Sequence, residues 1–184
     1  MTPVNRSPEP DLVADALALI TRSEGADPGR WLLVDVLEQA LFLMAGDRPG
    51  NAWTVSTAEA GLDNRDGSGG TPPGLHRIGR KIGRGAAPGD VFESREPTGR
   101  RWDPAAPPVE DDLILTRILT LDGCEEGLNR GPGVDSRERY IYIHGTNHEG
   151  RLGAPVSHGC VRMANRDVID LFDRVEEGDP VVIL

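Results

Sequence analysis

Short apolar runs separated by turn-forming residues are the feature that most constrains the fold of this chain. Such runs occupy residues 31–36, 40–44, 52–56, 75–82, 113–121, 140–144 and 181–184. Leu113, Leu115, Leu119 and Leu121 alternate along one of them, as expected for one face of a strand. The 184 residues also include 23 glycines and 15 prolines, which favour a turn-rich, mainly β domain over a helical bundle.

The order of the runs predicts how the domain is organised. Residues 31–56 read as consecutive antiparallel strands. Residues 57–111 are mostly turn and loop, with one short strand at 75–82. Arg117 interrupts the strand at 113–121 and is expected to reach solvent or a carboxylate from the strand end, with contact to a substrate as the alternative. We expect no internal repeat and no linker that would separate two domains.

Two short helices are predicted from apolar residues at helical spacing. The first covers residues 11–22 and is expected to lie against the domain. The second begins after Asn165 as N-cap and ends at Gly178. Its apolar face consists of Val168, Leu171, Phe172 and Val175.

Charge and composition exclude several classes of protein. The formal net charge of −10 argues against a nucleic-acid surface and against an anionic membrane surface. No run approaches the ~20 apolar residues of a transmembrane helix. Residues 1–10 lack the basic-then-apolar order of a signal peptide, so the expected location is cytoplasmic. Two cysteines are too few for a disulfide framework, which favours reduced thiols.

The chemistry of the chain is concentrated near its C-terminus. His144 ends an apolar run, and a loop of small residues presents Cys160. A cysteine is nucleophilic only as thiolate, and a neighbouring imidazole can take its proton. His144 arrives from another strand and is a better candidate for the base than His158. Gly145 and Gly159 permit close backbone approach, and the amides of Gly159 and Cys160 could face a developing oxyanion.

Two other interpretations of the same residues remain open at this point. The potential zinc ligands are His144, His148, His158 and Cys160. The glycines around His144 and His148 favour a turn over the helix that such a pair of ligands would suit, and the His158–Cys160 pair needs a tight loop. Alternatively, the loop is purely structural and His144 is a satisfied core histidine.

The two segments together resemble a known signature. His144-Gly-Thr-Asn147 followed by Ser157-His-Gly-Cys-Val-Arg-Met163 is similar to the motif of the YkuD-type L,D-transpeptidases. Residues 31–36, 55–57 and 67–74 resemble, in order, three upstream segments of that domain. The resemblance covers residues 31–184, and residues 1–30 are then an N-terminal helical extension.

The resemblance implies a β sandwich or barrel with a few short helices that acts on peptidoglycan stem peptides or muropeptides. It implies that Cys160 is the nucleophile, that His144 is base and acid, and that the carbonyl of Gly145 orients His144. The amides of His158, Gly159 and Cys160 would form the oxyanion site. Arg162 would pair with a substrate carboxylate or brace the loop. No cofactor and no metal are implied.

The acceptor of the acyl group is left open by the motif. In the family the thiolate attacks the carbonyl of the third residue, usually diaminopimelate, and expels the terminal D-Ala. An amine of another stem peptide then completes transpeptidation, whereas water completes an L,D-carboxypeptidase reaction suited to soluble muropeptides. Residues 84–111 are expected to be a lid or a variable loop. A zinc-binding hydrolase and a non-catalytic wall-binding domain are the alternative functions, and the pattern predicts no oligomeric state.

Overall fold

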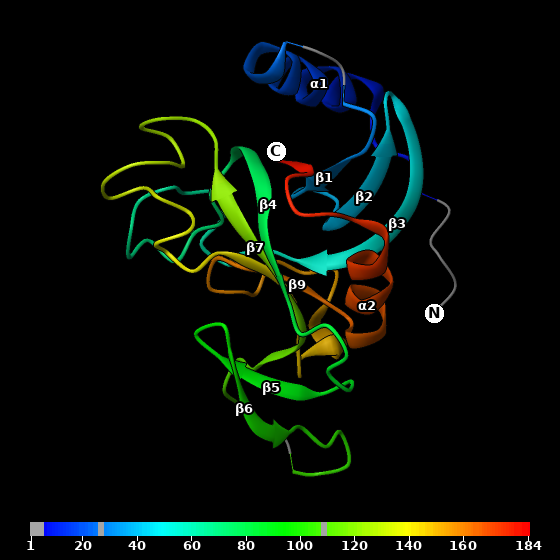
Figure 1. Cartoon of the computed structure of the whole chain (residues 1–184), viewed down its shortest axis with the longest axis vertical. Helices are drawn as coiled ribbons and strands as arrows, with labels where there is room; N and C mark the ends of the chain where they lie inside the picture. The colour runs from blue at the N-terminus through cyan, green and yellow to red at the C-terminus, as the bar shows by residue number, and fades with distance from the viewer. Residues whose placement is uncertain (1–5, 26–27, 108–109) are drawn as a thin grey trace.

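The computed structural model describes residues 6–25, 28–107 and 110–184, which form one ten-stranded sheet with two α-helices (Figure 1). The helices are α1 (Pro10–Glu24) and α2 (Asn165–Arg174), with a short 3₁₀ helix, η1 (Glu149–Arg151). The first five strands are β1 (Trp31–Asp35), β2 (Ala40–Ala45), β3 (Arg48–Ser56), β4 (Gly74–Ile82) and β5 (Asp90–Glu93). The others are β6 (Glu96–Arg101), β7 (Ile114–Gly123), β8 (Tyr142–Gly145), β9 (Val161–Met163) and β10 (Pro180–Ile183).

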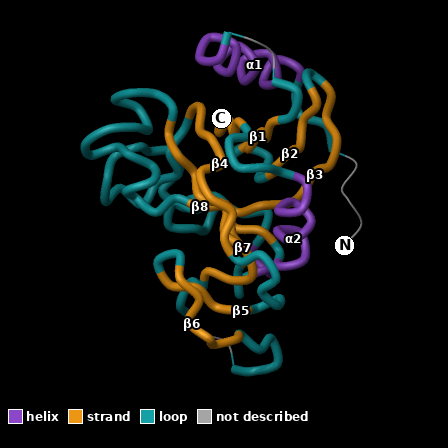
Figure 2. The backbone as a smooth tube through the Cα atoms, viewed as in Figure 1, coloured by secondary structure: helices purple, strands orange, loops and turns teal. Residues whose placement is uncertain are grey.

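The sheet closes on itself. Its strand order is β4-β10-β1-β2-β3-β9-β8-β7-β5-β6, and β4 also pairs with β7. That pairing closes the first eight strands of this order into a barrel, while β5 and β6 form a hairpin on the far side of β7 (Figure 2). Strand pairs β1–β10 and β8–β9 are parallel. The predicted mainly β sandwich or barrel with few helices is confirmed.

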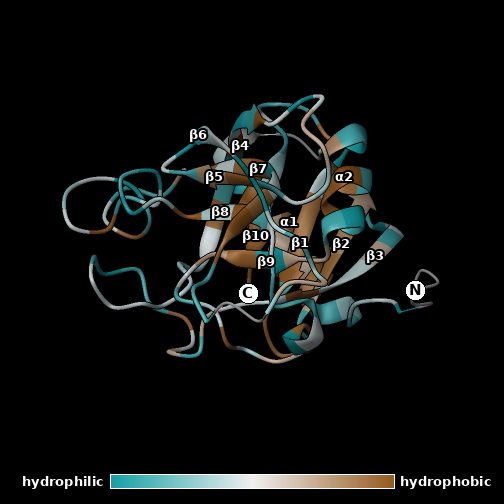
Figure 3. Ribbon diagram, turned by 90° about the horizontal axis from the view of Figure 1, so that it is seen from below, coloured by the Kyte–Doolittle hydropathy of each residue, from teal (hydrophilic) through white to brown (hydrophobic). Residues whose placement is uncertain are grey.

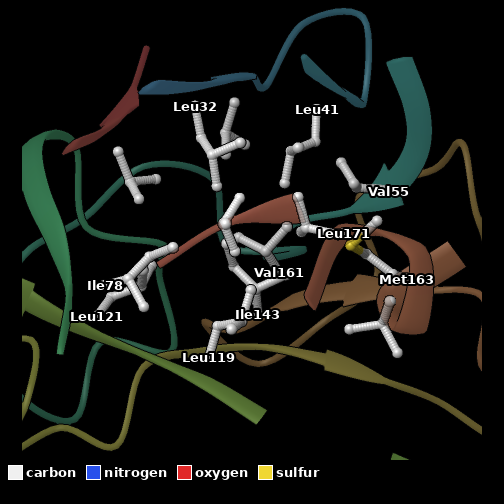
Figure 4. Packing of buried hydrophobic residues seen from close by; sticks show 14 of the residues in the cluster. Leu32, Leu41, Val55, Ile78, Leu119, Leu121, Ile143, Val161, Met163 and Leu171 are labelled. Atoms are coloured by element: carbon white, nitrogen blue, oxygen red, sulfur yellow. The ribbon is translucent and has the colours of Figure 1, made fainter. Parts of the chain in front are cut away.

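The barrel buries its apolar side chains in two main clusters. One contains Leu32, Ile143 and Val161 from the strands together with Leu171 and Phe172 of α2 (Figure 4). Full burial of an apolar side chain of this size stabilises the fold by about 1.5–3 kcal/mol, so this packing stabilises both the strands and α2. The hydrophobic residues accordingly gather on the central strands (Figure 3).

The N-terminal helix packs on the other apolar cluster. Val13, Ala16 and Ile20 of α1 lie against residues that include Trp31 and Phe42. A left-handed Gly25, with φ 73°, ends this helix, as glycine commonly does. Residues 1–5 and 26–27 of the predicted extension lie outside the described residues, and the division into residues 1–30 and 31–184 stays a prediction. Within the described part of the chain, no helix is both long and apolar enough to cross a membrane.

Most of the predicted helices and strands are present. The helix over residues 11–22, the antiparallel meander over 31–56, the strand at 75–82 and the final strand are all confirmed. The loop predicted over residues 84–111 is wrong in part, because it contains the β5–β6 hairpin. Strand β6 is almost entirely exposed and has no apolar alternation. It is a strand because it pairs with β5, which a hydrophobic pattern does not reveal.

The ends of α2 differ from the prediction. Ala164 is the N-cap and Asn165 is the first helical residue. The amide of Asn165 donates instead to Glu149 Oε1 at 2.7 Å, so a remote carboxylate satisfies this helix end. The helix ends at Arg174, and Gly178 lies in the turn that follows it, with φ 95°.

Strand β7 is irregular at its centre. The register shifts between Leu115 and Ile118, and Thr116 has a φ of 71°. The alternation predicted from the leucines is therefore broken by a bulge. Arg117 is buried, and its Nη1 donates to the carbonyls of Thr116 at 2.7 Å and Ala86 at 2.8 Å. The prediction that Arg117 reaches solvent or a carboxylate is therefore wrong.

Candidate active site

Strands β8 and β9 place the two halves of the motif side by side. They run parallel, with Ile143 opposite Val161 and His144 opposite Arg162. Because neighbouring residues of a strand face opposite sides, Ile143 and Val161 enter the core while His144 and Arg162 face the other side. Cys160 directly precedes β9 and packs against the cluster that contains Tyr142. The predicted proximity of the two segments is present.

The sulfur of Cys160 lies between two tyrosine backbones. The amide of Tyr142 donates to Sγ at 3.3 Å, and the thiol donates to the carbonyl of Tyr140, also at 3.3 Å. Burial raises the pKa of Cys160 to about 12, and Asp112 adds to the increase, whereas the Tyr142 amide, Arg162 and Arg139 oppose it. The resting residue is therefore a protonated thiol at neutral pH and requires a base to become nucleophilic.

His144 is oriented by its own neighbour in the chain. It is buried, and its Nδ1 lies 2.7 Å from the carbonyl oxygen of Gly145. That bond assigns the ring proton to Nδ1 and leaves Nε2 as the acceptor. Burial lowers the pKa of His144, with Asp112 and the Gly145 carbonyl acting in the opposite direction. The imidazole is thus neutral at pH 7 and can accept a proton.

Close backbone packing allows only glycine after His144. A Cβ on Gly145 would lie 2.5 Å from Asn165 Oδ1 and 2.7 Å from the Leu115 carbonyl. Asn165 itself donates from Nδ2 to the carbonyl of Thr146 at 2.9 Å and to Glu149 Oε1 at 2.7 Å. The first residue of α2 therefore fixes the loop that follows His144.

The loop before Cys160 is held by a residue from the Thr-Pro-Pro-Gly segment. Thr71 donates from Oγ1 to the carbonyl of Gly159 at 2.9 Å. Gly159 has a φ of +128°, and a Cβ there would lie 3.2 Å from the Gly70 carbonyl. The amide of Gly159 donates to Ser157 Oγ at 3.3 Å. Of the three amides predicted for the oxyanion site, the Gly159 amide is therefore already engaged.

Arg162 lies beneath the site and not on its surface. Its side chain is 2% exposed, and Nη2 contacts Asp112 Oδ2 at 2.5 Å. Asn147 holds the backbone on both sides of Asp112. Its Oδ1 accepts from the Leu113 amide at 3.0 Å, and its Nδ2 donates to the Asp111 carbonyl at 2.9 Å. This placement favours the bracing role of Arg162 over the pairing with a substrate carboxylate.

The remaining histidines do not converge with the thiol to hold a metal. The side chain of His158 is 81% exposed, and its Nδ1 lies 3.9 Å from Asp112 Oδ2. His148 Nε2 lies 3.4 Å from the side-chain nitrogen Nδ2 of Asn147. Among residues 6–25, 28–107 and 110–184, no group of three or more His, Cys, Asp or Glu side chains is placed to bind a metal ion. The zinc interpretation therefore has no support in this geometry.

Two charged residues near the site were not found from the sequence. Asp112 is 50 residues from Arg162 in the chain, and no motif links them. Arg139 donates from Nη2 to the carbonyl of Gly70 at 2.7 Å, and so braces the loop that touches Gly159. Asn147 belongs to the motif, but the sequence does not indicate that its side chain bonds the backbone on both sides of Asp112.

We expect Asp112→Ala to destabilise the protein, because the buried guanidinium of Arg162 would lose its carboxylate. Breaking such a pair should lower the free energy of unfolding by about 3 kcal/mol. Urea unfolding followed by circular dichroism measures the change. The matched control is Asp170→Ala, since Asp170 pairs with Arg174 at 2.8 Å on the exposed face of α2 and should cost about 0.5 kcal/mol or less. Equal losses in the two variants would contradict the role given to Asp112.

Comparison with known proteins agrees with this geometry. The family model of the L,D-transpeptidase catalytic domain (YkuD) matches residues 29–183. YkuD of Bacillus subtilis is 35% identical over 83 residues, which cover 41% of this chain and 51% of that protein. YbiS of Escherichia coli K12 is 49% identical over 43 residues, 23% of this chain and 14% of the relative. The matched part thus spans about half of YkuD and a smaller share of YbiS.

Solved structures show the same fold at low sequence identity. L,D-transpeptidase 3 from Mycobacterium tuberculosis superposes with a TM-score of 0.53 at 14% identity, covering 85% of this chain and 61% of that one. The L,D-transpeptidase from Xylanimonas cellulosilytica gives a TM-score of 0.51 at 17% identity, covering 88% and 63%. With a family match over most of its length, a barrel of this fold and the paired histidine and cysteine segments, the chain belongs to the L,D-transpeptidase catalytic-domain family.

Proposed function

We propose that this protein is a cysteine acyltransferase that cleaves the bond between diaminopimelate and the terminal D-Ala of peptidoglycan stem peptides. The observation that carries the proposal is the pairing of β8 with β9, which brings His144 on β8 beside the segment that leads from Cys160 into β9, with Nδ1 of His144 fixed by the Gly145 carbonyl. Membership of the family supports the reaction class.

In the acylation step, Nε2 of His144 takes the proton of the Cys160 thiol as Sγ attacks the diaminopimelate carbonyl carbon. The amides of His158 and Cys160 donate to the developing oxyanion, and the Gly159 amide joins them by leaving Ser157 Oγ. The C–N bond then breaks, and His144 returns the proton to the departing amine of D-Ala. A thioester on Cys160 remains.

Deacylation uses the same residues. An amine or water attacks the thioester carbonyl while His144 removes the proton of the attacking group. The C–S bond breaks, and the thiol of Cys160 is regenerated. An amine acceptor gives a transpeptide and water gives a tripeptide, so transpeptidase and L,D-carboxypeptidase share every step up to the acceptor. The cytoplasmic location expected from residues 1–10 stays a prediction.

A product assay tests the proposal. The protein is incubated with a disaccharide-tetrapeptide, with and without a D-amino acid, and the products are analysed by mass spectrometry. We expect release of D-Ala in both cases. Tripeptide alone identifies water as the acceptor, whereas an exchanged D-amino acid or a cross-linked dimer identifies an amine.

Other outcomes separate the alternative functions. Binding of the tetrapeptide without either product would refute the proposal and favour a wall-binding domain. Activity that disappears on chelation, together with stoichiometric zinc in the purified protein, would favour a metal-dependent hydrolase.

A further inference from the structure

The hairpin beside the active site ends in a strained turn. Ser94 and Arg95 connect β5 to β6 with φ values of 47° and 82°. Two-residue hairpin turns with positive φ favour glycine and asparagine, and other residues tolerate such angles at a cost of about 1–3 kcal/mol each. Positive φ at both central residues is what a two-residue hairpin turn of this kind requires, so the turn fixes the point at which the Arg95 side chain leaves the hairpin.

Arg95 points from this turn towards two tyrosines. Its Nε donates to the hydroxyl of Tyr142 at 2.8 Å, and its Nη2 donates to the carbonyl of Arg137 at 2.6 Å. Its Cζ lies 4.6 Å from the ring centroid of Tyr140 and 5.4 Å from that of Tyr142. All these partners are neutral, so they fix the guanidinium without cancelling its charge.

The other arginines of the hairpin behave differently. Arg100 pairs with Glu93 at 2.5 Å, and Arg101 pairs with Asp90 at 2.8 Å. No carboxylate of the described residues forms an ion pair with Arg95, and no acceptor among them lies on its Nη1. The guanidinium of Arg95 is therefore fixed in position, keeps its positive charge and has N–H donors left for a ligand. Such a group is suited to binding an anion.

The same two tyrosines flank the nucleophile. The amide of Tyr142 and the carbonyl of Tyr140 both contact Sγ of Cys160 at 3.3 Å. Tyr140 is half-exposed and has a φ of 58°, a second strained position in this wall. Arg95 and Tyr140 line a cavity of about 490 Å³ together with Asp135, Arg137 and Glu138.

The other charges of this cavity are largely committed. The carboxylate of Asp135 accepts from the amides of Gly131, Arg137 and Glu138 at 3.0–3.2 Å. The guanidinium of Arg137 turns towards Asp122, with Nη1 3.8 Å from its Oδ2. Glu138 is exposed. Arg95 is thus the charge of this cavity best placed to receive a ligand.

We propose that Arg95 binds the free C-terminal carboxylate of the donor peptide and thereby selects peptides that end one residue after the scissile bond. This inference rests on the proposed function. A C-terminal carboxylate lies about 4 Å beyond the reacting carbonyl, and its bond to a guanidinium spans about 2.8 Å. The cation must therefore lie within about 7 Å of the carbonyl that Cys160 attacks. Arg95 contacts the side chains of Tyr142 and Tyr140, whose backbone amide and carbonyl hold the sulfur, which makes it the candidate cation on this side of the site.

The experiment compares a tetrapeptide ending in D-Ala with the same peptide ending in D-alaninamide. For the wild-type protein we expect kcat/KM to be about 10- to 100-fold higher for the acid, the size of a hydrogen bond to a charged group. Arg95→Gln keeps a donor for Tyr142 but removes the charge. This substitution should lower kcat/KM for the acid peptide by that factor and leave kcat/KM for the amide peptide nearly unchanged. Arg95→Lys should restore part of the preference.

Arg100→Gln is the matched control, because Arg100 lies on the same hairpin but is paired with Glu93. It should retain the preference for the acid. Equal losses for acid and amide in Arg95→Gln, or a wild-type protein that does not distinguish them, would overturn the inference.

A binding measurement separates this inference from the proposed function. Calorimetry on Cys160→Ala with the acid and the amide peptide requires no turnover. A preference for the acid that disappears with Arg95→Gln supports the inference even if the wild-type protein releases no D-Ala, in which case only the proposed function fails. Equal binding of the two peptides overturns the inference while D-Ala release by the wild-type protein upholds the function.

Discussion

Cys160→Ala should lower the release of D-Ala from a tetrapeptide by about 10⁴-fold or more, because the thioester cannot form without the sulfur. The fold should be unaffected, since the side chain is half-buried at the edge of the cluster around Tyr142 and alanine leaves the backbone contacts in place. The measurements are D-Ala release by a coupled assay and the thermal midpoint by circular dichroism.

Cys124→Ala is the matched control for this variant. Cys124 is also partly buried but follows β7 on another part of the barrel, where its Sγ contacts the carbonyl of Asp122 at 3.8 Å. It should retain turnover close to that of the wild-type protein. Retained turnover in Cys160→Ala would refute the nucleophile assignment, whatever the behaviour of Cys124→Ala.

His144→Ala should lower acylation by about 10²- to 10⁴-fold, the usual contribution of a positioned general base. His158→Ala should change it by about twofold or less, because the exposed imidazole is removed while the His158 amide remains. Rates of acylation are measured in single-turnover experiments by mass spectrometry. The reverse ranking would exchange the roles of the two histidines.

The pH profile offers an independent check on His144. Burial holds the pKa of His144 below its ordinary value of 6.5, so the imidazole stays neutral to a lower pH than an exposed histidine. Activity should therefore be retained on acidification below pH 6.5 and be lost only as the pH falls through the lowered pKa, where His144 becomes protonated. A loss of activity that begins well above pH 6.5 would contradict the assignment.

The sequence was most informative where apolar residues decide the structure. Strands such as β1 and β2 are almost fully buried, so their composition alone predicts them. Strand β6 is exposed and polar, and only its partner β5 makes it a strand. The bulge at Thr116 was also missed, since a positive φ at a non-glycine residue is imposed by tertiary contacts.

The residues of the candidate site also differ in how far the sequence alone could identify them. His144 and Cys160 were identified because a short motif contains both, together with the glycines that shape the loop. Asp112 and Arg95 were missed because their partners, Arg162 and Tyr142, are distant in the chain and are brought near only by the tertiary fold. Asn165 was expected to be a helix cap, but its side chain bonds the loop after His144 instead.

Two strand pairings connect the β1–β3 meander to the rest of the barrel. One is the pairing of β1 with β10, which also pairs with β4, and the other is the pairing of β3 with β9. Both bring together segments that are far apart in the sequence, and contacts of this kind slow folding. We therefore expect the framework that holds His144 and Cys160 to form after the local hairpins of the barrel.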